Sequence, residues 1–332
     1  MAYYFKLPEN LTIDQQRALN DTCPIRLYGG PGTGKTVVNL WRHIRNHEQG
    51  VNSLLLTYTK TLEYYLEFSA KEKNEKASKN VSRTYKWTFG REKTSYDEII
   101  IDEAQDVEMD RYAIIKKYAN NVSYGADLDQ GIYHSPEVVK DIIDNLKKMY
   151  PLNSEHTLYK NFRNSKEILL FTQEVFPDIV IERETIKDAE SHNLPFVSIV
   201  GWNNNSMIDK VHEIVREYTS ETTNIGILFP TTSPVDEYYE SLKDEFKCSR
   251  FYSEQEDFEG LENVHITTFK SAKGIEFDTV VIPNFDSYDW FINNTKVSMN
   301  EYYVALTRAK TNLFLVCKNN LKGINNTTYQ SE

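Results

Sequence analysis

The stretch "GGPGTGKT" has the spacing of a phosphate-binding loop and follows the apolar run "IRLY" (25–28), which predicts a short strand. Glycines in such a loop let backbone N–H groups and the start of the following helix point at phosphate oxygens. Lys35 would then contact the β and γ phosphates, and the Thr36 hydroxyl would bind Mg²⁺. The stretch therefore predicts a nucleoside triphosphate site. The nucleotide-binding residues predicted on it are Gly29, Gly32, Gly34, Lys35, Thr36 and Val37.

A pair of carboxylates ends the apolar run "EIII" (98–101). Asp102 is placed to hold Mg²⁺, directly or through water, because P-loop enzymes use an acid in this position to bind the metal. Glu103 is placed to orient or deprotonate the attacking water. The alternative is a simple helix N-cap, where carboxylates are also favoured. Together with the phosphate loop, the pair predicts hydrolysis of a nucleoside triphosphate.

Short β-branched or aromatic runs alternate with stretches of helical periodicity along the chain. The alternation predicts an α/β fold with doubly wound, mostly parallel sheets. There are more such runs than one sheet of this kind usually needs, and a break near Tyr150–Pro151 would give two domains, residues 1–150 and 151–332. Strands are expected at 25–28, 53–58, 98–102, 122–127, 156–160, 196–200, 225–229, 264–269, 279–283 and 313–317.

The composition is that of a globular protein, since 40% of the 332 residues are hydrophobic and 26% are charged. The N-terminus lacks a basic start followed by an apolar stretch, and no apolar run reaches about 18 residues. We therefore expect a cytoplasmic protein with no membrane partner. Cys23, Cys248 and Cys317 have no metal-ligand spacing and are expected to be free thiols.

The net charge of −11 argues against a surface coated in basic residues for gripping nucleic acid. One segment differs, because residues 71–93 hold eight Lys or Arg against three Glu. A solvated helix and loop would account for this composition equally well. Any contact with a phosphate backbone must therefore be local.

The motifs "GPGTGKT" and "DEAQD" together resemble those of superfamily 1 DNA helicases of the UvrD/Rep type. Further stretches resemble that family's motifs in order between residues 11 and 310: "LTIDQQRAL", "LLLTYTKTL", "SRTYKWTF", "ADLDQGIY", "YKNFRNS", "ITTFKSAKGIEF" and "YVALTRAK". The resemblance implies two tandem RecA-like P-loop NTPase domains with mostly parallel sheets. It also implies ATP and Mg²⁺ as cofactors, single-stranded DNA as a partner and movement from 3′ to 5′.

The resemblance assigns roles to residues in both predicted domains. Gln130 would sense the γ phosphate, while Arg163 and Arg308 would contact the γ phosphate from the second domain. The implied contacts with the nucleoside are Gln15 and Phe162 at the adenine and Glu276 near the ribose. The implied catalytic set is Lys35, Asp102, Glu103, Gln130, Arg163 and Arg308. The implied DNA contacts are Thr57, Lys60, Thr84, Tyr85, Trp87, Tyr133, Thr268 and Lys270.

The chain departs from typical members of that family. Only "REKTSYD" separates "TYKWTF" from the strand that ends at Asp102, so we expect the first helical insertion of the family to be absent, and the second as well. The family's base-stacking stretch after "QGIY" is replaced by "HSPE", and one stacked base is worth about 1–3 kcal/mol. Tyr85, Trp87 and Tyr133 could compensate.

Two functions follow from these observations. The first is an ATP-dependent helicase or translocase that hydrolyses ATP between its two domains to move on single-stranded DNA. The alternative is an ATP-gated regulatory subunit of a nuclease or phage-defence complex, with little unwinding activity alone. The order of the motifs favours the first, whereas the negative net charge, the small size and the missing base-stacking stretch favour the second.

Overall fold

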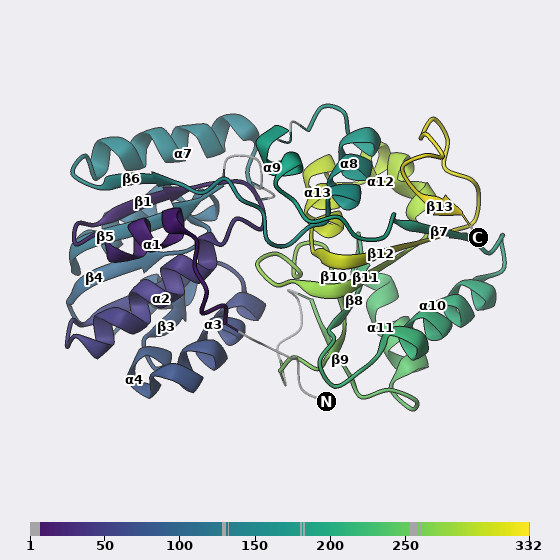
Figure 1. The fold of residues 1–332 in the computed structure, drawn as a ribbon. Coiled ribbons are helices and arrows are strands. Elements are labelled where there is room, and N and C mark those ends of the chain that lie inside the picture. The colour runs from purple at the N-terminus through teal and green to yellow at the C-terminus, as the bar shows by residue number, and fades with distance from the viewer. Residues whose placement is uncertain are drawn as a thin grey trace. The chain divides into compact units, whose positions relative to one another are not determined.

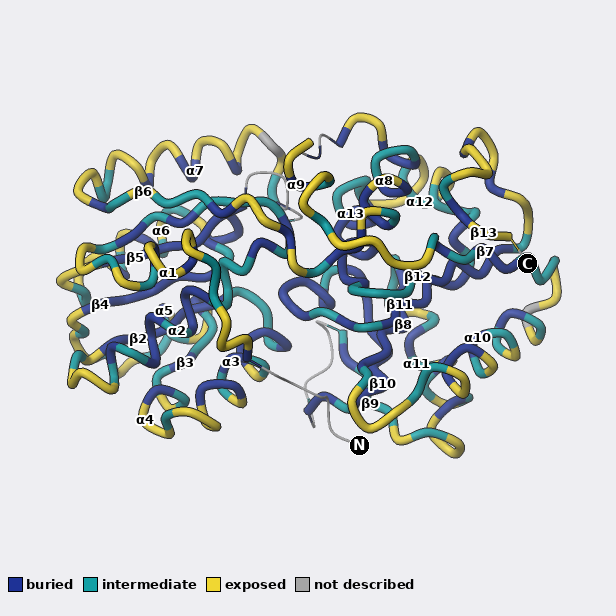
Figure 2. Tube along the Cα trace, viewed as in Figure 1, coloured by how far each residue is buried: buried dark blue, intermediate teal, exposed yellow. Residues whose placement is uncertain are grey.

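The computed structural model describes residues 7–127, 131, 133–179, 181, 183–252, 258 and 260–331. The chain divides into two compact units, which we call the first unit (Phe5–Lys160) and the second unit (Asn161–Glu332). Each unit contains one sheet with helices packed on it (Figure 1). Strands of both sheets are mostly buried, whereas the outer faces of the helices are exposed (Figure 2).

The sheet of the first unit has six strands in the order β3-β2-β4-β5-β1-β6, and every neighbouring pair is parallel. Its central strands are nearly continuous apolar runs, as expected when helices cover both faces of a parallel sheet. The strands are β1 (Ile25–Tyr28), β2 (Ser53–Thr57), β3 (Val81–Arg83), β4 (Tyr96–Ile101), β5 (Ala119–Ala126) and β6 (Ser154–Thr157).

Alternation along β4 separates the two cores of the first unit. Ile100 packs with residues of α2, α3 and α4 on one face, whereas Ile99 and Ile101 pack with residues of α6 and α7 on the other. The helices are α1 (Ile13–Asn20), α2 (Lys35–Glu48), α3 (Lys60–Lys73), α4 (Glu75–Ser78), α5 (Thr84–Phe89), η1 (Ala104–Asp106), α6 (Met109–Ile115) and α7 (Pro136–Met149).

The sheet of the second unit has seven parallel strands in the order β13-β7-β12-β11-β8-β10-β9. They are β7 (Phe196–Ile199), β8 (Ile225–Phe229), β9 (Cys248–Phe251), β10 (Val264–Thr268), β11 (Phe277–Pro283), β12 (Ala309–Cys317) and β13 (Gln330–Ser331). The helices are α8 (Lys166–Val175), α9 (Arg183–Lys187), α10 (Asn204–Tyr218), α11 (Ser233–Leu242), η2 (Phe285–Ser287), α12 (Tyr288–Asn294) and α13 (Met299–Leu306). Side chains of α10 and α11 fill the core on one face of this sheet.

These parallel sheets confirm the predicted fold class, and every predicted strand is present with its ends shifted by a few residues. Three strands, β3, β9 and β13, were not predicted. All three lie at sheet edges, where a strand pairs on one side only and needs no long apolar run. Residues near the polar C-terminus form β13, which pairs with β7.

The division between the units follows Lys160, whereas the sequence suggested a break near Tyr150–Pro151. The reason is β6, which was assigned to the second domain but pairs along its length with β1, from Ile25↔Ser154 to Tyr28↔Thr157. The turn at Pro151 therefore lies inside a β-α-β connection of the first unit. Residues 90–95 join α5 directly to β4, as expected for a core without the first insertion.

Candidate nucleotide site

The phosphate-binding loop connects β1 to α2, the position that a P-loop takes. Gly29, Gly32 and Gly34 have φ values of 150°, 69° and 89°. A Cβ atom on Gly34 would lie 2.4 Å from the Gln15 Nε2 atom, so this position has no room for a side chain. Val37, in the first turn of α2, packs against the core beside α3.

The Lys35 ammonium is folded back onto the loop. It donates to the carbonyl oxygens of Gly29 and Gly30 at 2.6 and 2.9 Å, and lies 3.2 Å from Asp127 Oδ2. The Lys35 side chain is only 11% exposed. The cation thus lies against the loop that leads into α2, where a P-loop lysine is needed to contact phosphate groups.

Asp102, directly after β4, is 2% exposed and meets the start of α2. Its carboxylate accepts hydrogen bonds from Thr36 Oγ1 and Asn39 Nδ2, both at 2.8 Å. Burial and the neighbouring Glu103 raise the pKa of Asp102 to about 6, against the lowering effect of these bonds and of Lys35. Asn39 was not predicted, because its role depends on how α2 lies on β4.

Asp102 and Thr36 fit Mg²⁺ in their chemistry. Both supply oxygen ligands, which Mg²⁺ prefers, and the direct hydrogen-bond donors to Asp102 are neutral, so its negative charge is available to a cation. Among the described residues, no group of three or more His, Cys, Asp or Glu could form a complete metal cage.

Glu103 belongs to a short chain of hydrogen bonds at the same edge of the sheet. It has a left-handed φ of 57°, and its Oε2 accepts from Gln105 Nε2 at 2.6 Å. Gln105 is buried, and its Oε1 accepts from the Asp127 backbone N–H at 3.1 Å. Gln105 and Asp127 were not predicted as site residues, although "DEAQD" contains Gln105. Gln130, predicted to sense the γ phosphate, lies outside the described residues.

Gln15 ties α1 to the phosphate loop. Its Oε1 accepts from the Thr12 backbone N–H at 3.0 Å as part of a capping box, and its Nε2 donates to the Thr33 carbonyl at 3.0 Å. The side chain is 5% exposed. The predicted adenine reader is therefore next to the loop, with both ends of its amide already engaged.

In the second unit, Arg163 and Glu276 form a direct ion pair. Arg163 Nε donates to Glu276 Oε2 at 2.7 Å, and Lys310 Nζ lies 2.7 Å from Glu276 Oε1. Burial opposes ionisation of Glu276, but Lys310 and Arg163 together hold the pKa of this carboxyl well below its usual range. Phe162, the neighbour of Arg163, is 50% exposed.

Arg308 is 1% exposed and is held by its own unit. Its Nε donates to the Val304 carbonyl at 3.0 Å, and its Nη1 donates to the Ile275 carbonyl at 3.3 Å, one residue before Glu276. Asn164 Nδ2 donates to the carbonyls on both sides of Arg308 at 2.9 and 2.7 Å. The structure therefore brings the segments of Arg163, Glu276 and Arg308 together, although they are far apart in sequence.

The predicted DNA contacts of the first unit differ in exposure. Thr57 and Thr84 are buried, and Thr84 Oγ1 donates to the Thr57 carbonyl at 3.1 Å. Trp87 packs edge-on against Tyr118, with a centroid distance of 5.8 Å, and is partly buried against the core beside α6. Tyr85, in contrast, is 61% exposed.

The remaining predicted DNA contacts lie at the ends of helices and strands. Lys60 is the first residue of α3. The Tyr133 ring lies 4.5 Å from that of Tyr58, centroid to centroid. In the second unit, Thr268 ends β10, and Lys270 Nζ lies 3.6 Å from Glu301 Oε1.

Two parallel α/β units, one of which carries a phosphate loop facing a buried carboxylate, define a P-loop nucleoside triphosphatase fold. Its RecA-like form is shared with the solved structure of S. cerevisiae Dbp5 bound to RNA and ADP BeF3. That structure has a TM-score of 0.56 and 14% identity, and the match covers 94% of this chain and 85% of that chain.

The chain belongs to the UvrD-like helicase C-terminal domain family, whose model matches residues 57–320, and this confirms the predicted family. A probable DNA helicase of Mycoplasma pneumoniae is 26% identical over 234 residues, which are 66% of this chain and 43% of that protein. A probable DNA helicase II homolog of the same organism is 27% identical over 162 residues, 44% of this chain and 22% of that protein. The chain thus spans less than half the length of these curated relatives.

A membrane span was not expected. In the described part of the chain, the helices are all too short or too polar to cross a bilayer.

Proposed function

We propose that this chain is an ATP-dependent helicase or translocase that moves on single-stranded DNA. The observation that carries the proposal is the position of Asp102, a buried carboxylate that accepts hydrogen bonds from the Thr36 hydroxyl and the Asn39 amide, near the loop that carries Lys35. Membership of the UvrD-like helicase family supports the same reading.

Residues of the first unit would bind ATP and Mg²⁺ at this loop. Lys35 would exchange its bonds to the Gly29 and Gly30 carbonyls for bonds to the β and γ phosphates. Asp102 and Thr36 would hold Mg²⁺, which when bound offsets the negative charge of the phosphates. Glu103 would accept the proton of the attacking water, or orient that water.

Residues of the second unit would supply positive charge to the transition state. An arginine in this role contributes about 10³- to 10⁵-fold in rate in P-loop enzymes. Arg163 and Arg308 are brought together by the fold of their own unit, which supports a shared role. Hydrolysis that needs arginines from one unit and the loop of the other would couple ATP turnover to movement of the units.

The test is ATPase activity with no nucleic acid, single-stranded DNA, duplex DNA or RNA, at low and moderate salt. We expect the largest stimulation with single-stranded DNA. Indifference to single-stranded DNA at both salt concentrations would contradict the proposal. Duplexes with a single 3′ or 5′ tail would then test the implied 3′ to 5′ direction.

The second candidate is an ATP-gated regulatory subunit of a nuclease or phage-defence complex. The net charge of −11 favours it, because a protein that grips DNA by itself is usually basic on the binding surface. Co-purification of a stable partner, with DNA-stimulated hydrolysis only in the complex, would support this function. Translocation by the isolated monomer would contradict it.

A further inference from the structure

Two buried carboxylates lie on one face of β4. Glu98 is 5% exposed and Asp102 is 2% exposed. Because side chains alternate along a strand, positions 98, 100 and 102 point the same way. Ile100, between the two acids, packs with Leu40 and Ile44 of α2. The face of β4 that α2 covers therefore carries an acid at each end and an apolar residue between them.

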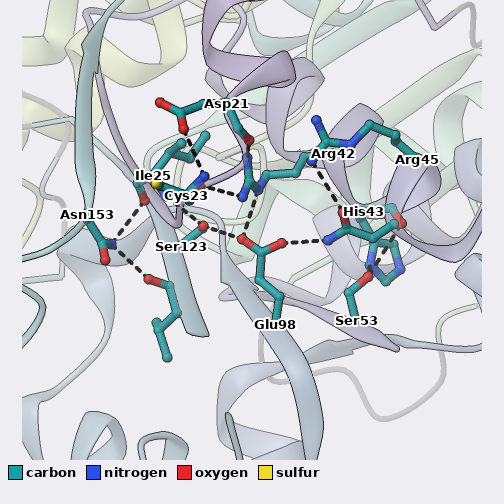
Figure 3. A network of polar contacts seen from close by, with 12 residues as sticks. Asp21, Cys23, Ile25, Arg42, His43, Arg45, Ser53, Glu98, Ser123 and Asn153 are labelled. Atoms are coloured by element: carbon teal, nitrogen blue, oxygen red, sulfur yellow. Dashed lines mark hydrogen bonds and ion pairs between the residues drawn. The ribbon is translucent and has the colours of Figure 1, made fainter. Parts of the chain in front are cut away.

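Donors from α2 and β5 hold Glu98 (Figure 3). Arg42 Nε donates to Oε1 at 2.8 Å and Asn46 Nδ2 donates to Oε2 at 2.5 Å, while the Ser123 hydroxyl also donates to Oε1. The other two guanidinium nitrogens of Arg42 donate to carbonyls of the segment before β1, at 2.8 and 2.7 Å. Because the whole guanidinium fork is engaged and Arg42 is only 2% exposed, its position is fixed.

The same helix holds the other acid of β4. Thr36 and Asn39, in the first turns of α2, donate to Asp102, whereas the donors to Glu98 come from later turns. From the midpoint of Thr36 and Asn39 to the midpoint of Arg42 and Asn46, α2 advances by about 10 Å. From Glu98 to Asp102, the extended backbone advances by about 13 Å. The two advances differ by about 3 Å, a gap that the side chains can span. Hydrogen bonds therefore join α2 to this stretch of backbone at two points, Glu98 and Asp102.

The two acids differ in how their charge is balanced. Glu98 faces a guanidinium, whereas the donors that Asp102 meets among the described residues are a hydroxyl and an amide. Between them β4 is a central strand, paired with β2 on one side and β5 on the other. Because Glu98 and Asp102 belong to one continuous stretch of extended backbone, a shift of Glu98 along α2 would also move Asp102.

We propose that Arg42 and Asn46 are positioning residues for the magnesium site. By fixing Glu98 they set where β4 lies along α2, and hence where the Asp102 carboxylate meets Thr36 and the Mg²⁺ of a bound nucleotide. This inference rests on the proposed function, since it requires that the first unit binds ATP with Mg²⁺.

The experiment measures the affinity of the full chain for a fluorescent ATP analogue in Mg²⁺ and in EDTA. Arg42→Lys keeps the charge but loses the fork, Asn46→Ala removes one donor, and Glu98→Gln removes the acid. The gain from Mg²⁺ is the ratio of the affinity in Mg²⁺ to the affinity in EDTA. We expect this ratio to fall about tenfold in each variant, as for residues that orient a metal ligand, while the affinity in EDTA stays unchanged.

Asn153→Ala is the matched control. Asn153 is buried at the same end of the sheet, and its amide donates to the Ile25 and Val122 carbonyls at 3.2 and 2.8 Å. These bonds involve neither α2 nor β4. Asn153→Ala should therefore lower the midpoint of urea unfolding and leave the affinity gained from Mg²⁺ unchanged.

The outcomes separate three cases. Loss of the gain from Mg²⁺ in the α2 and β4 variants, but not in the control, supports the positioning role. A lower urea midpoint with an unchanged gain, or an equal loss of affinity in Mg²⁺ and EDTA, overturns it. If the wild-type chain binds no ATP under either condition, the proposed function itself is wrong.

Discussion

At the scale of single residues, Lys35 is the strongest candidate for mutation. Its ammonium contacts two loop carbonyls and Asp127, so the chain itself places it at the loop. We expect Lys35→Ala to lower the ATP hydrolysis rate by about 10²-fold or more, because a preorganised charge on the phosphates is lost. Steady-state ATPase measurements test this. Lys79→Ala, which removes an exposed ion pair with Glu75, serves as the control; substantial turnover by Lys35→Ala would show that the site is assigned wrongly.

The raised pKa of Asp102 predicts a pH dependence. Its pKa of about 6 exceeds the ordinary value of 3.8, so the folded protein holds a proton there between these values and must release it to bind a metal. The gain in nucleotide affinity from Mg²⁺ should therefore fall as the pH drops from about 7 to 5. By the same linkage, the stability that the protonated carboxyl contributes is lost as the pH rises through about 6.

Binding titrations across this pH range, with and without Mg²⁺, check the prediction. Asp102→Asn cannot titrate, so its weak binding should be insensitive to pH over the same range. If the wild type kept its full gain from Mg²⁺ at pH 5, Asp102 would not be the metal ligand.

Tyr85 and Trp87 were both predicted to contact DNA, but they differ in exposure. Tyr85 is 61% exposed, whereas Trp87 packs with Tyr96 and Tyr118. Tyr85→Ala should weaken single-stranded DNA binding by about 1–3 kcal/mol, the value of one stacked base, with little change in stability. Trp87→Ala should instead lower stability by about 3–5 kcal/mol. Fluorescence anisotropy measures the DNA affinity of both variants, and urea unfolding measures their stability. A stability loss in Tyr85→Ala with unchanged DNA affinity, or a loss of DNA affinity in Trp87→Ala with unchanged stability, would contradict these roles.

At the scale of elements, close packing between β8 and β11 leaves no room for a side chain at Gly226. A Cβ atom on Gly226 would lie 2.5 Å from the ring of Phe277. Gly226→Ala should destabilise the protein by about 1–3 kcal/mol through overpacking. Urea unfolding measures this loss, and Phe277→Leu in the same chain should recover part of it, because the two side chains share one space. Additive losses in the double variant would show that the contact is unimportant.

The sequence predicted the elements well where apolar runs are long and central. Local spacing around a strand end and a helix start also pointed to Lys35, Thr36 and Asp102 as site residues, and the structure brings Thr36 Oγ1 within 2.8 Å of Asp102 Oδ2. Asn39 could not be identified in this way, since its bond to Asp102 depends on the angle at which α2 crosses β4. Arg42 and Glu98 were missed for the same reason, although Arg42 lies among apolar residues of its helix and Glu98 directly precedes an apolar run.

At the scale of the whole molecule, the two units carry different parts of the proposed chemistry. The first unit holds the residues that we propose to bind phosphates and metal. The second unit gathers Arg163, Glu276 and Arg308 from distant segments of the chain. Because Arg308 already bonds to carbonyls of its own unit, its position does not depend on a nucleotide. A preorganised pair of arginines is what charge stabilisation in a transition state requires.

This arrangement predicts that loss of either arginine separates turnover from binding. Arg163→Ala and Arg308→Ala should each lower kcat by about 10³-fold while changing the affinity for ATP several-fold at most, since the charge acts mainly in the transition state. Lys310→Met is the matched control, because it removes a neighbouring positive charge that also contacts Glu276 but has no predicted contact with phosphate. Single-turnover hydrolysis and equilibrium binding give the two quantities separately. Equal losses in binding and turnover, or an equal effect of Lys310→Met, would mean that these arginines maintain the fold of their unit and do not act on ATP.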